Sequence, residues 1–337
     1  RAFVTGGTGF IGRHLVAELV RRQVPLNCLI RTPDPPSHLQ HPLIRCIQGD
    51  LQDRSALLQG TDDVDQVFHL AGLTHAITRE ELDQTNGSAC GTLADVCMQQ
   101  KSVPRIVYLS SQAAAGPTAR ANPPRVEEEG CHPISDYGRS KRRGEMELQK
   151  RADRLPCTVI RPGIVCGPHD TAALSMYRCI DRYRLHLVVG MRTPPLSLIG
   201  VEDLVELIIC AAERGETLTG HTDGEYSPRG YYFACDDRAH PTYAQLGRQV
   251  AAALDRGVFV WPIWRWVGRC IAGVAQTASH LRGESSILNV DKVREGSAPS
   301  WACSSRKASE QLGFSPRLDL DGWLRKTADW YRTNDWL

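Results

Sequence analysis

A tyrosine and a lysine stand four residues apart in the segment YGRSK, which contains Tyr137 and Lys141. A helix predicted from about Ser135 places residues with this spacing on one helical face. An ammonium near a phenol favours the phenolate, so Tyr137 could exchange a proton with a bound substrate near neutral pH. The alternative is a surface tyrosine beside a solvated lysine, because so short a pattern also occurs by chance.

A serine ends the apolar run RIVYLSS, which spans Arg105 to Ser111. This run predicts a buried strand, and Ser111 then lies at the carboxyl edge of a sheet, where open α/β folds bind ligands. A hydroxyl at this edge can donate a hydrogen bond to a substrate oxygen on which negative charge develops. Taken alone, Ser111 could instead cap a turn with its hydroxyl.

The opening stretch AFVTGGTGFIG places three regularly spaced glycines between a strand and an amphipathic helix. Glycines in this setting let the backbone approach a pyrophosphate, whose charge lies at the helix N-terminus. A tight strand-to-helix turn packed against the sheet is the alternative. The residues of this loop expected to contact a dinucleotide are Gly6, Gly9, Phe10, Ile11 and Gly12.

The end of the second predicted strand, CLIRTP, distinguishes NAD from NADP. A carboxylate there accepts hydrogen bonds from the adenine ribose, whereas a cation pairs with a 2′-phosphate. Ile30 occupies the expected carboxylate position and Arg31 follows it, so the sequence favours NADP over NAD. An arginine that stacks on adenine or points to solvent would leave NAD as the cofactor.

Two further strand ends supply expected cofactor contacts. In GDL, Asp50 could accept a hydrogen bond from the adenine amino group, with Leu51 beside it. In HLAG, the small residues after His69 could lie along the cofactor, whereas His69 itself is expected to be a packed residue. The contacts expected from HLAG are Leu70, Ala71 and Gly72.

Six short apolar runs, each followed by a polar or amphipathic stretch, must position these residues. The runs are AFVT, PLNCLI, LIRCIQ, QVFHLA, RIVYLS and CTVIRP. This alternation predicts an α/β fold with a doubly wound parallel (Rossmann) sheet that extends to about Gly167. We therefore expect a dinucleotide-binding Rossmann domain at residues 1–167. Residues 168–337 are expected to form mostly a smaller α/β substrate-binding lobe, with some segments returning to the Rossmann domain.

The second half of the chain has a looser pattern. It predicts a helix at Gly200 to Arg214, a strand at Tyr231 to Cys235, a helix at Tyr243 to Asp255 and a Trp-rich helix near Trp261 to Arg282. The stretch VFVWPIWRWVGRCIAGVAQ is the most hydrophobic candidate for a membrane span. It contains Pro262, Arg265 and Arg269, so we interpret it as an amphipathic helix instead.

The overall composition excludes several classes of protein. The 337 residues are 42% hydrophobic, which suits an ordinary globular core, and the 40 basic and 38 acidic residues are scattered, which gives no nucleic-acid surface. Twelve cysteines without a CxxC pair predict free thiols in a cytoplasmic protein and no metal site. Because the chain begins inside a strand without Met, we expect a trimmed N-terminus whose signals, if any, lie outside this sequence.

Taken together, the motifs carry a resemblance to a known family over nearly the whole chain. The motifs are TGGTGFIG, TNGSACGT, YGRSK, RPGIVCGP and LIGVEDLVE. The chain resembles the extended short-chain dehydrogenases/reductases, of the NAD(P)-dependent epimerase/dehydratase type. Within that family it is similar to the dihydroflavonol-reductase-like and 3β-hydroxysteroid-dehydrogenase-like members.

This resemblance implies roles for individual residues. It implies that Ser111, Tyr137 and Lys141 are a catalytic trio, that Tyr137 and Lys141 also contact the cofactor, and that Asn86 and Pro162 support cofactor binding. It also implies a homodimer, formed through helices at about residues 80–100 and 135–154.

Departures from the family pattern bear on the substrate. Gln112 and Ala113 replace the acidic pair that family dehydratases carry after the serine, so dehydration is not expected. Ala115 and Cys166 replace tyrosines that sugar-nucleotide epimerases tend to have, which weakens that assignment. The expected activity is NAD(P)-dependent interconversion of a secondary alcohol and a ketone. The alternatives are an NDP-sugar 4-epimerase that uses the same trio and a dinucleotide-binding protein without turnover.

The Trp-rich helix gives a hint about the substrate. Trp261, Trp264 and Trp266 would make it a bulky apolar element where the family builds its substrate pocket, which favours an apolar small molecule such as a sterol-like or acyl ketone. Packing in the core or against a membrane surface is the alternative.

Overall fold

A seven-stranded parallel sheet forms the centre of the protein. The computed structural model describes residues 1–119, 123–220, 226–264, 266 and 290–337. In spatial order the strands are β3 (Ile44–Gln48), β2 (Leu26–Ile30), β1 (Ala2–Thr5), β4 (Gln66–His69), β5 (Arg105–Leu109), β6 (Cys157–Pro162) and β10 (Tyr231–Ala234). All neighbouring pairs run parallel. The strand order reverses between β1 and β4, so the predicted doubly wound fold is confirmed.

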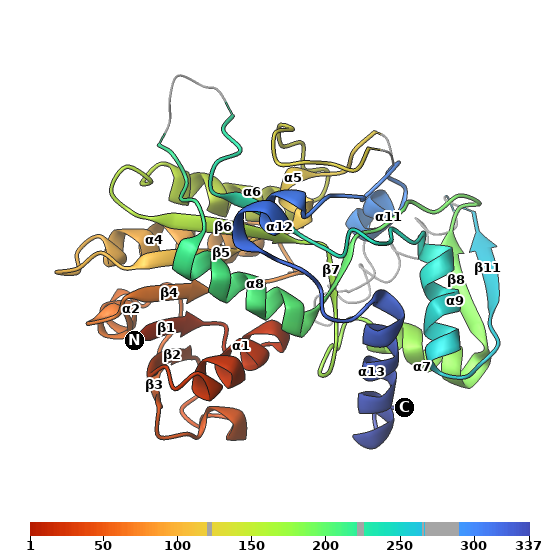
Figure 1. The fold of residues 1–337 in the computed structure, drawn as a ribbon, viewed down its shortest axis with the longest axis horizontal. Coiled ribbons are helices and arrows are strands. Elements are labelled where there is room, and N and C mark those ends of the chain that lie inside the picture. Colours follow the sequence, from red (N-terminus) through yellow and green to blue (C-terminus); the bar gives the residue numbers. More distant parts are fainter. Residues whose placement is uncertain (120–122, 221–225, 265, 267–289) are drawn as a thin grey trace.

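Helices cover both faces of this sheet (Figure 1). One face carries α1 (Phe10–Arg21), α8 (Val201–Arg214) and α12 (Arg306–Leu312). The other face carries α2 (Arg54–Thr61), α4 (Ala89–Cys97) and α6 (Asp136–Gln149). Short connecting elements are η1 (Ser37–Leu39), α3 (Arg79–Leu82), the π-helical η2 (Asp83–Ser88) and α5 (Gln112–Ala115). Because both faces are covered, the central strands are buried along almost their whole length rather than at alternate residues.

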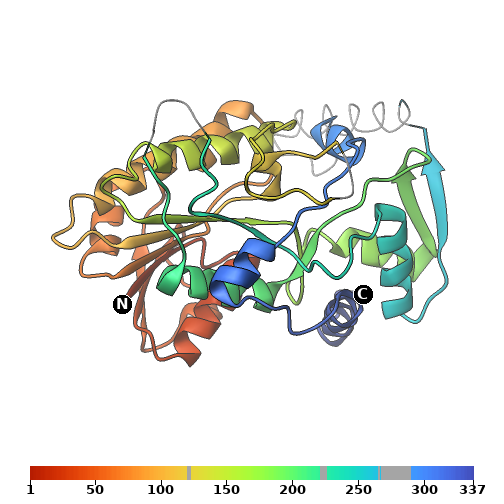
Figure 2. The same ribbon diagram turned by 45° about the horizontal axis from the view of Figure 1, so that its top comes forward.

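The remaining elements gather into a smaller lobe at one end of the sheet. Two small parallel sheets pair β7 (Ile164–Cys166) with β9 (Leu198–Gly200), and β8 (Leu185–Val189) with β11 (Phe259–Ile263). The helices of the lobe are α7 (Leu174–Tyr183), α9 (Tyr243–Ala253), α11 (Val290–Gly296) and α13 (Leu320–Thr333). Figures 1 and 2 show β8 and β11 at the far end of the molecule, beyond α9.

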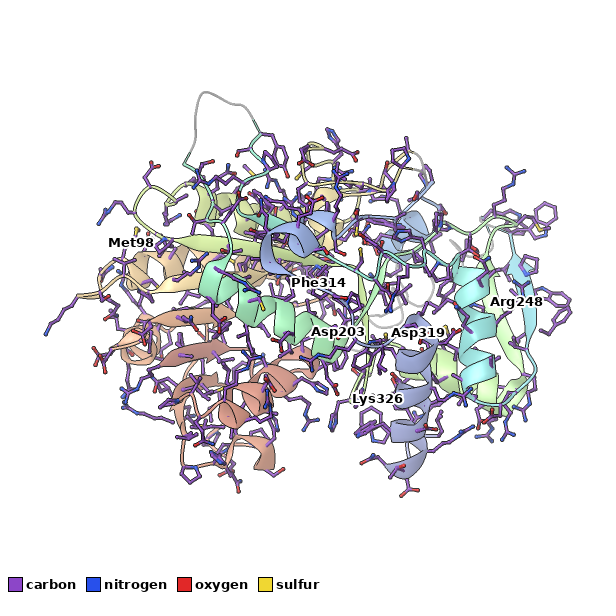
Figure 3. The ribbon with its side chains drawn as sticks, viewed as in Figure 1. Met98, Asp203, Arg248, Phe314, Asp319 and Lys326 are labelled. Atoms are coloured by element: carbon purple, nitrogen blue, oxygen red, sulfur yellow. The ribbon has the colours of Figure 1, made fainter. Side chains whose placement is uncertain are left out.

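A hydrogen-bonded junction joins the lobe to a helix of the sheet. The buried carboxylate of Asp203, on α8, accepts from the indole nitrogen of Trp323 at 2.8 Å and from the backbone N–H of Arg317 at 3.1 Å. Lys326 pairs with Glu202 at 2.5 Å. Figure 3 labels Asp203 and Lys326 at the place where α8 meets α13. The lobe is therefore held to the sheet by α13 as well as by its chain connections.

The predicted Trp-rich helix is wrong at its first residues, 261–263. Residues 259–263 form strand β11, which pairs in parallel with β8. Pro262 lacks a backbone N–H and disfavours a helix interior, whereas Phe, Val and Trp favour a strand on an edge. Residues 265 and 267–289 lie outside the described residues, and so does most of the predicted helix. Among the described residues, no helix is long and apolar enough to cross a membrane.

The other elements expected in the second half are present. The predicted helices at residues 200 and 243 are α8 and α9, and the predicted strand at Tyr231 is β10. Strand β10 pairs with β6 and extends the seven-stranded sheet, so a segment beyond Gly167 returns to it.

A buried ion pair fixes α6 to the sheet. Glu145 of α6 and Arg161 of β6 are both fully buried and form two hydrogen bonds, at 2.8 and 2.7 Å. Ser110, at the end of β5, donates to the same carboxylate at 2.6 Å, and Arg142 lies 2.9 Å from it. Burial raises the pKa of Glu145, but Arg161 and the other donors outweigh burial and lower the pKa to about 2.

Replacing Arg161 tests this anchor. Arg161→Met should lower the free energy of unfolding by about 3–5 kcal/mol, because it leaves the Glu145 carboxylate buried without its principal partner. Urea unfolding measures the change. Arg306→Met removes an exposed cation that lies 3.8 Å from Glu310 and should cost less than about 1 kcal/mol. A loss below about 1 kcal/mol for Arg161→Met would contradict the anchoring role.

The same pair predicts a pH dependence of stability. The pKa of Glu145 is depressed in the folded state, so its contribution to stability is present above the ordinary carboxyl pKa of 4.5. This contribution is lost as the pH falls from 4.5 to about 2. Unfolding measured across this window should therefore show a shallower acid dependence in a Glu145→Leu, Arg161→Met double variant than in the wild type.

Candidate active site

A glycine loop occupies the point where the strand order reverses. Gly6 follows β1 with a φ of +78°, and a Cβ built on it would lie 2.6 Å from the backbone nitrogen of Ala71, just after β4. A Cβ built on Gly12 would lie even closer to the carbonyl oxygen of Gly6. At these two positions the loop therefore exposes backbone atoms, with no room for a side chain. The first turn of α1 carries no acidic residue, so its N-terminus keeps its positive potential. This arrangement fits a pyrophosphate.

Cationic and imidazole groups surround this loop, and the sequence analysis missed them. Arg13 lies 2.6 Å from Nδ1 of His169 and 3.3 Å from Nδ1 of His38. Nε2 of His38 lies 3.1 Å from the carbonyl of Gly7, so His38 donates there and can accept from Arg13. Burial and the charge of Arg13 lower the pKa of His169 to about 4, which keeps it a neutral acceptor. Of these three residues, only Arg13 could be linked to the glycine loop from the sequence, because it directly follows Gly12.

The adenosine-side residues lie at the ends of β2 and β3. Arg31 directly follows β2 and is exposed. Oδ1 of Asp50 accepts from the backbone N–H groups of Gln52 at 2.7 Å and of Asp53 at 3.0 Å. Asp50 therefore stabilises its own turn, and Leu51 is buried in that turn. Both turns are at the same edge of the sheet as Gly6, because the strands are parallel.

The segment after β4 is held by a buried asparagine. Asn86 accepts from the backbone N–H of Leu73 and donates to its carbonyl, both at 2.8 Å, and donates to Ser140 of α6 at 2.9 Å. A Cβ on Gly72 would lie 2.7 Å from Oδ1 of Asn86 and 3.5 Å from Nζ of Lys141. Leu70, Ala71 and Gly72 therefore lie between the glycine loop and α6.

The histidine that precedes this segment is a packed residue. His69 is fully buried, with Nδ1 2.7 Å from the Thr5 hydroxyl and its ring stacked on Tyr108. Burial, together with the charge of Lys141, lowers the pKa of His69 to about 3. His69 is therefore neutral.

Ser111 and Tyr137 meet at the carboxyl edge of β5. Ser135 caps α6 by accepting from the backbone N–H of Gly138 at 3.0 Å, so Tyr137 lies in the first turn. The Ser111 side chain lies near enough to the Tyr137 phenol to lower its pKa. Ser111 also accepts from the backbone N–H of Ala113 at 3.2 Å and caps α5. The turn-capping alternative and the contact with Tyr137 are thus both present.

Lys141 lies on the same face of α6 as Tyr137 but contacts the strand rather than the phenol. Its Nζ donates to the carbonyl of Leu109 at 2.7 Å and lies 4.3 Å from the centre of the Tyr108 ring. Burial lowers the pKa of Lys141 to about 8. Pro162 is buried at the carboxyl end of the adjacent strand, β6.

A second lysine, which the sequence analysis missed, lies beside Tyr137. Nζ of Lys292, on α11, is 5.8 Å from the centre of the Tyr137 ring and 2.8 Å from Glu295. Burial raises the pKa of Tyr137, whereas the nearby Ser111 side chain and the charge of Lys292 lower it. Helix α11 reaches α6 because Asp291 accepts from the backbone N–H of Asp136 at 2.6 Å. No local pattern connects Lys292 to Tyr137.

The residue after Ser111 has a structural role. Gln112 is buried and its amide donates to the carbonyl of Trp301. This position therefore supplies an amide that joins α5 to the C-terminal segment, and it supplies no acidic proton.

Comparison with known proteins identifies similar chains. A model of the NAD dependent epimerase/dehydratase family matches residues 2–222. The chain is 28% identical to a 4-hydroxy-2-methyl-3-oxo-4-farnesyl-3,4-dihydroquinoline-1-oxide ketoreductase of Stigmatella aurantiaca, over 87% of this chain and 90% of that one. It is 26% identical to a ceramide reductase of Caulobacter vibrioides, over 99% and 95%. Its fold is similar to that of a UDP-glucose 4-epimerase of Thermotoga maritima, with a TM-score of 0.75, 20% identity and 99% of both chains covered.

Removing the charge of Lys292 should change the acidity of Tyr137. Lys292→Met should raise the pKa of Tyr137, because the ammonium favours the phenolate. NMR titration of ring-labelled tyrosine measures this, with Tyr137→Phe identifying the signal. Lys150→Met removes an exposed lysine at the other end of α6 and should leave that pKa unchanged. A titration of Tyr137 that is the same with and without Lys292 would show that the two side chains do not interact.

Proposed function

The chain belongs to the NAD dependent epimerase/dehydratase family, and on that premise we propose that it interconverts a secondary alcohol and a ketone. It is an NAD(P)-dependent enzyme of the extended short-chain dehydrogenase/reductase type. The observation that supports this reaction most directly is the proximity of Ser111 to Tyr137 at the carboxyl edge of β5, where Ser111 lowers the pKa of the phenol. This proximity supports the proposal of a proton donor and an oxygen-binding hydroxyl at the edge where open α/β folds bind substrates.

In the proposed reaction, each member of the trio has one task. A bound nicotinamide would supply the hydride for reduction or accept it in oxidation. During reduction Tyr137 donates its phenolic proton to the ketone oxygen, and during oxidation its phenolate takes the proton back. Ser111 donates a hydrogen bond to the same oxygen as negative charge develops on it. Lys141 binds the nicotinamide ribose.

The proposed cofactor site follows the carboxyl edge of the sheet. The glycine loop binds the pyrophosphate through backbone N–H groups, and the turns after β2 and β3 bind the adenosine half. In the proposal the cofactor contacts are Gly6, Gly9, Phe10, Ile11, Gly12, Arg31, Asp50, Leu51, Leu70, Ala71, Gly72, Asn86, Tyr137, Lys141 and Pro162.

We favour NADP over NAD as the cofactor. Arg31 is exposed directly after β2, and Ile30 replaces the carboxylate that would repel a 2′-phosphate. Arg13 adds a second positive charge at the neighbouring glycine loop. Both features favour an anionic group on the adenine ribose.

Reduction of an apolar ketone fits the chain better than epimerisation. The two relatives described above are named for reduction of a farnesyl-bearing dihydroquinoline oxide and of ceramide, and both matches cover most of each chain. Gln112 supplies no acid for a dehydration. An NDP-sugar 4-epimerase with the same trio is the second candidate, because structures of similar fold include UDP-sugar enzymes.

The proposal includes a compartment and an oligomeric state. The described cysteines are all free thiols, which supports a cytoplasmic enzyme. Helices α4 and α6 pack side by side on one face of the sheet (Figure 1). Their outer surfaces are the proposed interface of a homodimer, and equilibrium sedimentation would measure its mass.

Replacing the phenol tests the reaction. Tyr137→Phe should lower kcat by about 10²–10⁴-fold, because it removes the proton donor, while NADPH still binds. The assay follows NADPH absorbance with long-chain and steroid ketones, and NADPH fluorescence reports binding. Tyr183→Phe, an exposed phenol on α7, should keep full activity.

Two outcomes would contradict this proposal. Retained turnover in Tyr137→Phe would reject Tyr137 as the proton donor. Conversion of UDP-glucose by the wild type without net change in cofactor, and with no ketone reduced, would identify an epimerase instead.

Replacing Arg31 tests the cofactor preference. Arg31→Ala should weaken NADPH binding by about tenfold, the equivalent of about 1.4 kcal/mol, and leave NADH binding unchanged. Arg45→Ala removes an exposed arginine in the middle of β3 and serves as the control. Titration calorimetry with both dinucleotides measures the difference. Equal weakening for NADPH and NADH would mean that Arg31 contacts a part common to both.

A further inference from the structure

The small β8–β11 sheet has one packed face and one open face. On the packed side His186 and Val188 are buried, and Nε2 of His186 lies 3.0 Å from the carbonyl of Tyr243 on α9. The register places Leu187 directly opposite Trp261 on the other side. These two side chains are 48% and 53% exposed. Parallel strands such as these ordinarily have both faces covered, so the open face is unusual.

Further apolar side chains enlarge this open face. We use the term aromatic patch for five residues, with exposed fractions from 48% to 87%: Leu187, Met191, Phe259, Trp261 and Trp264. Together with Pro262 and Ile263, the three aromatic residues of the patch line a shallow hollow. An apolar group of this size on a surface indicates a binding partner rather than chance exposure.

Among the described residues, the position of the patch leaves it accessible to a large flat partner. In Figures 1 and 2, β8 and β11 form the end of the molecule farthest from the seven-stranded sheet. Helix α9, which carries Arg248 in Figure 3, packs against their inner side.

The charge around the patch is positive. The segments 174–192 and 254–264 contain five arginines and two aspartates, a net charge of +3. Both aspartates lie near arginines: Asp181 is 3.0 Å from Arg256, and Asp255 is 3.8 Å from Arg332. The surface that remains around the patch is therefore cationic.

Two arginines flank the Leu187 and Met191 part of the patch along the chain. Arg184 immediately precedes β8, and its carbonyl accepts from the backbone N–H of Phe259 at 2.8 Å. Arg192 immediately follows Met191. Both are exposed, and the ion pairs found among the described residues include neither of them. Exposed tryptophan and phenylalanine side chains flanked by arginines are typical of protein surfaces that bind a lipid bilayer. They bind at the boundary between its headgroups and its acyl chains.

We propose that the aromatic patch binds the surface of a bilayer that contains anionic phospholipid. Trp261, Trp264 and Phe259 enter the interface, while Arg184 and Arg192 pair with headgroup phosphates. A second copy of the chain is a poorer occupant, because a two-fold contact through this face would bring the arginines of both copies together. The inference does not depend on the reaction of Tyr137.

Vesicle flotation of the full chain tests the proposal. Wild-type protein should float with vesicles of mixed phosphatidylcholine and phosphatidylglycerol, and less with phosphatidylcholine alone. The double variant Trp261→Ser, Trp264→Ser should bind at least about tenfold more weakly. The matched control, Leu58→Ser with Val103→Ser, removes two exposed apolar residues elsewhere and should bind like the wild type.

A second pair of variants tests the electrostatic part. Arg184→Glu with Arg192→Glu should abolish the preference for phosphatidylglycerol. Arg45→Glu with Arg54→Glu changes the charge equally on the β3 and α2 side of the Rossmann sheet and should preserve that preference. Circular dichroism and NADPH binding verify that each variant is folded.

Three outcomes would overturn the proposal. The first is wild-type protein that floats with neither vesicle, and the second is patch variants that bind as the wild type does. The third is a tryptophan variant that changes the oligomeric mass in sedimentation without changing flotation. In that case a second copy of the chain covers the patch.

Discussion

The buried ion pair between Glu145 and Arg161 is the constraint on which the arrangement of the site depends. Tyr137, Lys141 and Glu145 follow one another at intervals of four residues, so they share the face of α6 that meets the sheet. Because Glu145 is fixed to β6 and to Ser110 at the end of β5, α6 can neither slide nor rotate without leaving a charge unpaired in the interior. The position of Tyr137 beside Ser111 follows from this fixed register.

Close packing reinforces the same register. A Cβ on Gly144 would lie 2.6 Å from the Tyr108 hydroxyl and even closer to the carbonyl of Asn86, so α6 approaches its neighbours more closely than any other residue would allow. Asn86 in turn connects α6 to the segment after β4. Two sets of buried polar contacts on α6 thus position the candidate site: Glu145 fixes the helix to β5 and β6, and Asn86 connects it to the segment after β4.

The sequence alone predicts most of the fold and the residues at its strand ends, because these follow from local patterns. Apolar runs locate the six strands, and the spacing of YGRSK locates α6. Contacts made between distant segments are not predictable in this way. Lys292 reaches Tyr137 only because α11 docks on α6, and the histidines around Arg13 come from separate loops. The stretch at Trp261 was misassigned because its pairing partner, β8, is distant in the sequence and short apolar runs suit strands and helices alike.

The bond from Lys141 to the carbonyl of Leu109 has a thermodynamic consequence for ligand binding. An ammonium has three donors, and this contact uses one to fix the orientation of the other two. A free lysine side chain carries about 2 kcal/mol of rotamer entropy, which an unrestrained lysine would lose when it first ordered around a ligand. Here that entropy is lost when the protein folds. Binding of the proposed cofactor would therefore not have to restrict the Lys141 side chain a second time. The site is thus preorganised before anything enters it.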